Sequence, residues 1–110
     1  MTSYRKYKNI PTEVDGIIFH SKLEARRYGE LKLLQKEGEI KDLECQPIIP
    51  LMVNGKNIGK YIGDFMYYDN KFKKVILEDC KSKITKTTLY GLKKKILMTY
   101  DPPLEIQEIF

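Results

Sequence analysis

Two apolar runs joined by a polar turn decide the fold of this chain, and both lie within residues 60–81, KYIGDFMYYDNKFKKVILEDCK. We expect strands over roughly 60–68 and 73–80, because the residues between them are typical of a hairpin turn. Each run carries a carboxylate among apolar residues, Asp64 in the first and Asp79 in the second. A buried carboxylate costs on the order of several kcal/mol unless it is paired or binds a cation. The two acids therefore need a chemical explanation.

The strand region extends towards the N-terminus. A third apolar run covers roughly 44–53 and ends at Asn54-Gly55, a dipeptide that two-residue hairpin turns prefer. The three strands are therefore predicted to form an antiparallel meander. A shorter hairpin is expected over 12–19, where Asp15-Gly16 gives the same turn signal.

Two helices are expected on either side of the three strands. The first covers about 21–37, because Ser21 and Glu24 have the spacing of a capping box. The second runs from residue 87 or 88 to 100 and ends before two prolines. Apolar residues at helical spacing predict the buried stripes. These are Leu23, Tyr28, Leu31 and Leu34 in the first helix, and Leu89, Leu92, Ile96 and Tyr100 in the second.

The elements together indicate an α/β protein with a mixed sheet flanked by two helices. After the short N-terminal hairpin the order is helix, strand, strand, strand, helix and strand, the last strand covering 104–109. The chain has 110 residues, a common size for one domain. We interpret 12–110 as a single domain and 1–11 as a basic, flexible arm.

The end of the second run carries the chemistry. Side chains alternate along a strand, so Asp79 and Lys81 should point to one face and Glu78 and Cys80 to the other. If Asp64 lies on the same face of the neighbouring strand, two carboxylates and an ammonium group converge. Metal-assisted hydrolysis of a phosphodiester requires this arrangement: the carboxylates hold Mg²⁺, while the lysine orients water and stabilises charge on the phosphate.

The overall charge suits a polyanionic partner. Twenty Lys and Arg against 15 acidic residues give a net charge of +5 and a pI of about 9.1. We expect no structural zinc site, because Cys45 and Cys80 form no CxxC pair and His20 is the single histidine. No apolar leader or membrane-spanning segment is present, which favours a soluble intracellular protein with reduced thiols.

The acidic residues and the lysine resemble the PD-(D/E)XK nuclease motif. Asp64 is followed by fourteen residues and then by Asp79-Cys80-Lys81, and the expected elements are similar to the restriction-endonuclease-like αβββαβ core of that superfamily. Three longer phrases, TEVDG at 12–16, SKLEARRY at 21–28 and LKKK at 92–95, resemble a group of small phage-encoded proteins placed in the superfamily.

The resemblance implies a catalytic site of Glu24, Asp64, Asp79 and Lys81. Asp64 and Asp79 would be metal ligands, Lys81 would orient the attacking water, and Glu24 from the first helix would be an auxiliary ligand, with Mg²⁺ or Mn²⁺ as cofactor. Two features depart from the motif. Gly63 replaces its proline, and Glu78 beside Asp79 leaves the strand register open.

Simpler interpretations of these residues stay open. Glu24 is also explained as the partner of Ser21 in a helix cap, and the two roles are compatible. Asp79 and Lys81 are also explained as an ion pair on an exposed strand. We assign no catalytic role to His20 and interpret both cysteines as core thiols.

Several basic residues are candidates for contacts with DNA phosphates. The alternative is a solvated basic face and a disordered tail. The candidates are Lys83 and Lys86 after the second run, Lys93 and Lys94 in the second helix, and Arg5 and Lys6 in the arm, where Tyr4 and Tyr7 are available to stack on bases.

These observations predict a metal-dependent endodeoxyribonuclease. By resemblance it is structure-selective, of the Holliday-junction-resolvase kind, and a homodimer would supply the two sites that symmetric junction cleavage needs. The expected location is the cytoplasm, that of the host cell if the protein is phage-encoded. Two alternatives are a non-catalytic DNA-binding protein with the same fold and a small phage protein that acts on a host partner.

Overall fold

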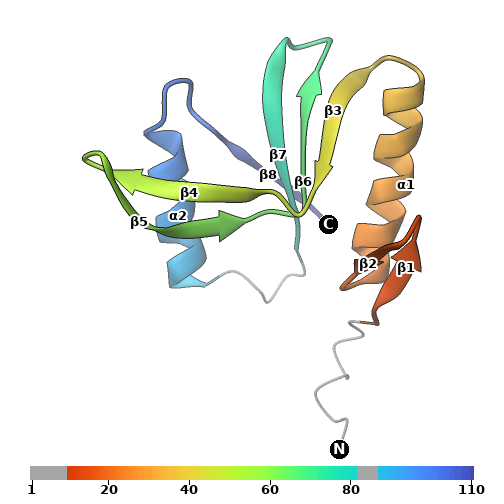
Figure 1. The fold of residues 1–110 in the computed structure, drawn as a ribbon, viewed down its shortest axis with the longest axis horizontal. Coiled ribbons are helices and arrows are strands. Elements are labelled where there is room, and N and C mark those ends of the chain that lie inside the picture. The colour runs from red at the N-terminus through yellow and green to blue at the C-terminus, as the bar shows by residue number, and fades with distance from the viewer. Residues whose placement is uncertain (1–9, 82–86) are drawn as a thin grey trace, which may run out of the picture.

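A four-stranded sheet forms the centre of the protein, whose computed structural model describes residues 10–81 and 87–110. The sheet has the order β3-β6-β7-β8 (Figure 1). Its strands are β3 (Ile40–Cys45), β6 (Phe65–Asp69), β7 (Lys74–Cys80) and β8 (Ile106–Ile109). Neighbours β3, β6 and β7 are antiparallel, whereas β8 runs parallel to β7. The expected mixed sheet is therefore confirmed.

Two hairpins lie outside this sheet. They pair β1 (Thr12–Val14) with β2 (Ile17–Phe19), and β4 (Ile48–Val53) with β5 (Lys56–Ile62). Both turns contain two residues with positive φ, a conformation that Asp, Asn and Gly tolerate best. The angles are 53° at Asp15, 77° at Gly16, 50° at Asn54 and 76° at Gly55. Both turn predictions are confirmed.

The predicted three-strand meander is wrong. The run at 44–53 is divided between β3 and β4, and the run at 60–68 between β5 and β6, so that β3 pairs directly with β6. Gln46 adopts a φ of 54° at the first break. Gly63 forms the second, where its N–H donates to the Pro47 carbonyl at 3.0 Å. These two breaks turn the β4–β5 hairpin out of the central sheet.

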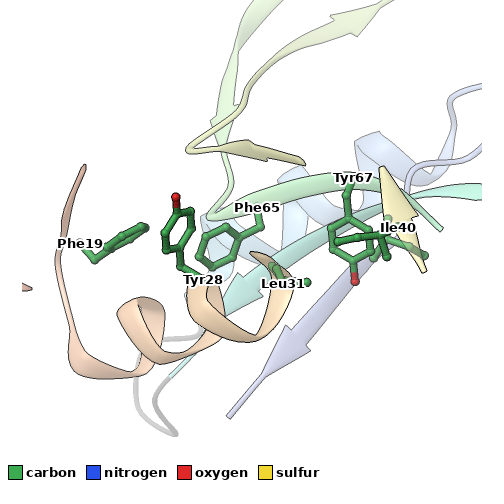
Figure 2. Close-up of a cluster of buried hydrophobic side chains, with 7 residues drawn as sticks. Phe19, Tyr28, Leu31, Ile40, Phe65 and Tyr67 are labelled. Carbon is green, nitrogen blue, oxygen red and sulfur yellow. The ribbon is translucent and has the colours of Figure 1, made fainter. Parts of the chain in front are cut away.

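Helix α1 (Lys22–Lys36) packs on one face of the sheet. Ser21 caps it by accepting a hydrogen bond from the Glu24 N–H at 3.2 Å, as the capping box predicts. Tyr28 and Leu31 are buried, while Leu23 and Leu34 are half-buried. Figure 2 shows the core that Tyr28 and Leu31 join, which includes Phe19, Ile40, Phe65 and Tyr67.

Helix α2 (Thr88–Met98) packs on the opposite face together with the β4–β5 hairpin. Its predicted stripe is wrong at Leu89 and Leu92, which are 59% and 54% exposed, whereas Ile96 and Tyr100 are partly buried against this core as predicted. The buried residues of the helix are Tyr90 and Leu97. The helix is turned in this way because Leu97 packs with Leu77 and Ile106 of the sheet. In the described ranges, neither helix is long and apolar enough to cross a membrane.

Candidate functional site

Asp79 and Lys81 lie at the carboxyl end of β7, on the face that α2 covers. The Lys81 N–H donates to the Ile109 carbonyl at 2.8 Å, which fixes the backbone here as a continuation of the β7–β8 ladder. Asp79 is 7% exposed and accepts a hydrogen bond from the Tyr61 hydroxyl. The Lys81 Nζ atom lies 3.4 Å from Asp79 Oδ2. The Asp79 carboxylate therefore has two partners: Tyr61 from β5 and Lys81, which directly follows β7.

Asp64 reaches the same end of β7 from the segment between β5 and β6. Its N–H donates to the Glu78 carbonyl at 3.0 Å, so the backbone extends the β6–β7 ladder by one residue. Its Oδ2 atom accepts from the Cys80 N–H at 2.6 Å. This side-chain bond to the neighbouring strand directs the Asp64 carboxyl group towards the end of β7, where Asp79 lies.

Two neighbouring acidic groups and burial act on the ionisation of Asp64. Burial raises the pKa of Asp64 well above its ordinary value, and the nearby charges of Glu24 and Asp79 raise it further, against the opposing effect of the Cys80 N–H. A buried carboxyl group whose ionisation is disfavoured in this way is stabilised in its charged form by a bound cation.

Glu24 approaches from the first turn of α1 and is 9% exposed. Its Oε2 atom lies 3.4 Å from the Ser21 hydroxyl, which donates to it. The charge of Glu24 also raises the pKa of Asp64. Glu24 therefore takes part in the helix cap and lies near Asp64 at the same time.

Glu78 points to the opposite face of the sheet from Asp79. It is fully buried and accepts two hydrogen bonds from Arg27 of α1, at 2.8 Å and 2.6 Å. The Tyr67 hydroxyl donates to the same carboxylate. Contact with Glu78 raises the pKa of Arg27, so the guanidinium group stays charged. In this register Glu78 completes a buried ion pair, and Asp79 faces the candidate site.

The donor set suits a cation that retains water ligands. Among the described residues, no group of three or more His, Cys, Asp or Glu side chains is assembled to hold a metal ion. Mg²⁺ usually binds through one or two carboxylates and keeps several waters. Asp64 and Asp79 fit that requirement, and Glu24 is placed to act through charge or through water.

A pocket of about 400 Å³ opens beside Asp79, between β5, the end of β7 and the first turn of α2. Three lysines, Lys60, Lys81 and Lys93, line it against the single carboxylate of Asp79. The remaining lining residues are Tyr61, Ile62, Thr87, Leu89 and Tyr90. Its excess of positive charge favours an anionic group such as a phosphate.

The other predicted DNA contacts are placed differently. Lys93 lines the pocket, whereas Lys94 lies 3.4 Å from Glu108 Oε2 in an ion pair. Arg5, Lys6, Lys83 and Lys86 lie outside the described residues, as does nearly all of the predicted arm at 1–11. His20 is exposed, and Cys45 and Cys80 are half-buried free thiols.

Tyr61, Tyr90 and Lys60 were not predicted from the sequence to belong to this site. Tyr61 and Tyr90 have the pattern of core aromatic residues, which they also are, since both belong to one buried cluster. Their hydroxyl groups bind Asp79 and Glu108, each eighteen positions away in the chain. Local spacing carries no signal for such partners.

The fold and site define a class of protein: a small mixed α/β domain with two acidic residues and a lysine at the end of a central strand, beside a basic pocket. Residues 4–108 match the family described as "Protein of unknown function (DUF1064)", and the chain belongs to this family. No curated protein and no solved structure matches the chain.

Proposed function

We propose that this protein is a metal-dependent endodeoxyribonuclease. The observation that carries the proposal is the position of Asp64, Asp79 and Lys81 at one strand end, beside a pocket with three lysines. The acids provide oxygen ligands, and the pocket provides positive charge for the phosphates of DNA. Phosphodiester hydrolysis needs both features in the same place.

Each residue then has a definite task. Asp64 and Asp79 would hold Mg²⁺ or Mn²⁺, which when bound activates water and polarises the phosphate. The ammonium group of Lys81 orients the attacking water and stabilises the negative charge that builds on the phosphate. The Tyr61 hydroxyl fixes the orientation of the Asp79 carboxylate. Lys60 and Lys93 bind the phosphates that flank the reacting one.

The order of elements supports the same class. With the β1–β2 and β4–β5 hairpins set aside, the chain runs α1, β3, β6, β7, α2 and β8, which is the order of the αβββαβ core that the PD-(D/E)XK resemblance implies. Asp64 immediately precedes β6, and Asp79 and Lys81 end β7. This order of the acidic residues and the lysine along the strands supports the proposal.

The proposed substrate is branched DNA, such as a four-way junction. The resemblance to junction-resolving nucleases favours recognition of DNA shape. A homodimer would place two sites on a symmetric junction. Both points rest on the resemblance to junction-resolving members of the superfamily.

A second candidate is a DNA-binding protein that does not cut. It is favoured by the finding that the described residues contain no assembled group of three metal-binding side chains. The basic pocket would then bind phosphate without hydrolysing it. The two candidates differ in their dependence on a divalent cation.

The test is cleavage of labelled four-way junction, flap and linear duplex DNA by the wild-type chain and by Asp79→Asn. We expect cutting with Mg²⁺ or Mn²⁺, none with a chelator, and a loss of at least about a hundredfold in the variant. Glu30→Gln is the matched control, because this carboxylate is exposed and lies outside the site. Binding without cutting under all conditions would favour the second candidate.

A further inference from the structure

Lys81 makes two contacts that together fix its ammonium group. Its side chain is 13% exposed, and its Nζ atom lies 3.4 Å from Asp79 Oδ2. The same atom lies 3.9 Å from the centre of the Tyr90 ring. An ammonium group over an aromatic face is attracted by the electron density of the ring. The ring and the carboxylate therefore hold the charge between them.

Tyr90 is itself held firmly. Its N–H donates to the Thr87 hydroxyl at 3.1 Å, in the cap of α2. Its hydroxyl donates to Glu108 Oε2 at 2.7 Å. Its ring lies 6.4 Å from the ring of Tyr61, which reaches Asp79. With its backbone N–H and its hydroxyl both bound, Tyr90 presents one constant ring face to Lys81.

Glu108 links this arrangement to the strand that carries the acid. It lies directly opposite Asp79 in the parallel pairing of β7 and β8. Side chains opposite each other in a sheet extend to the same face. Glu108, which anchors Tyr90, and Asp79, which lies beside Lys81, are thus neighbours on one pair of strands.

We propose that Tyr90 is a positioning residue that holds the Lys81 ammonium group in its working orientation. The inference rests on the proposed nuclease function. A lysine side chain is long and flexible, so a free ammonium group loses much conformational entropy when it engages water or phosphate. The ring of Tyr90 already restricts the Lys81 side chain, so less conformational entropy is lost at that step. The hydroxyl of Tyr90 orients the ring.

The geometry has a spectroscopic signature that needs no substrate. An aromatic face shields protons above it, so the Lys81 Hε protons should resonate upfield of the other lysines in a ¹H–¹³C spectrum. Lys81→Arg assigns the signal by removing it. We expect the shift to persist in Tyr90→Phe, which keeps the ring, and to vanish in Tyr90→Leu and Tyr90→Met. Tyr68→Leu is the matched control, because it removes a ring 5.0 Å from a different lysine, Lys41.

Cleavage kinetics test the consequence. We expect kcat to fall about tenfold in Tyr90→Leu and Tyr90→Met, with KM nearly unchanged, and to stay within about threefold in Tyr90→Phe and Tyr68→Leu. Absence of the upfield signal in a wild-type chain that cuts DNA would overturn the role of Tyr90 alone. So would an unchanged kcat in both Tyr90→Leu and Tyr90→Met. A wild-type chain that shows the signal but cuts no substrate would overturn the nuclease function, and this role with it.

Discussion

Glu78 and Asp79 are adjacent acids with different surroundings. Alternation along β7 sends Glu78 to the face of α1, where Arg27 and Tyr67 bind it, and Asp79 to the face of α2, where Tyr61 and Lys81 bind it. Glu78 has a full set of partners from the fold itself. Asp79 lies in the lining of an open pocket. One acid is thus a structural residue, and its neighbour is available for chemistry.

The structural role of Glu78 predicts a large cost for its removal. Glu78→Gln should lower the free energy of unfolding by about 3 kcal/mol, because Arg27 keeps a charge that has lost its buried partner. Urea denaturation measures this cost. Glu30→Gln removes an exposed partner of the same arginine and should cost less than about 1 kcal/mol. Equal costs for the two variants would contradict the assignment.

At the scale of elements, the β4–β5 hairpin forms one wall of the pocket. Lys60, Tyr61 and Ile62 of β5 line it. The hairpin does not pair with the central sheet, and Tyr100 after α2 provides an anchor for it. The Tyr100 hydroxyl accepts from the Met52 N–H at 2.8 Å and donates to the Pro50 carbonyl at 2.5 Å. A single side chain thereby ties β4 to the end of α2.

Loss of that anchor should loosen the hairpin locally. In Tyr100→Phe we expect faster hydrogen exchange at the Met52 amide and a loss of about 1 kcal/mol in stability, because two backbone groups lose their partner. Amides of β6 serve as the internal control, since they pair within the central sheet. Unchanged exchange at Met52 would show that other contacts hold the hairpin.

Local chemistry explains which elements the sequence predicts correctly. The two hairpin turns and the Ser21 cap depend on a few neighbouring residues, and all three are confirmed. The breaks at Gln46 and Gly63 depend on distant contacts: a Cβ atom at Gly63 would lie 2.8 Å from Leu77 Cδ1. The buried face of α2 is likewise set by tertiary partners, so its hydrophobic pattern alone predicts the buried stripe only in part.

At the scale of the whole molecule, the sheet separates two cores. One lies under α1 and contains Tyr28 and Tyr67, and the other lies under α2 and the β4–β5 hairpin and contains Tyr61 and Tyr90. The hydroxyl group of each of these four tyrosines donates a hydrogen bond to a carboxylate. The acceptors are Asp15, Glu78, Asp79 and Glu108. Alternation in β7 predicts the opposite directions of Glu78 and Asp79. The carboxylates that bind the tyrosine hydroxyls come from other segments of the chain, and the sequence pattern does not predict them.

These buried tyrosines predict sensitivity to alkali. Burial, together with the Asp15 carboxylate, raises the pKa of Tyr28 from 10.0 to about 12. A raised folded-state pKa means that the folded chain binds the Tyr28 proton more tightly than the unfolded chain does. The stability that this protonated hydroxyl contributes is therefore lost as the pH rises from about 10 to about 12. Denaturation across this range should show a weaker pH dependence in Tyr28→Phe than in the wild type. Identical profiles would mean that Tyr28 does not contribute.

We propose that Asp64 and Asp79 form a site for a divalent cation. The most direct measurement is the binding of Mn²⁺ to the full chain, followed by the loss of the free-ion signal in electron paramagnetic resonance. We expect binding by the wild type and by Glu30→Gln, and binding at least about tenfold weaker in Asp64→Asn and in Asp79→Asn. Mn²⁺ binding of equal strength in all four chains, or none in the wild type, would show that Asp64 and Asp79 do not form this site.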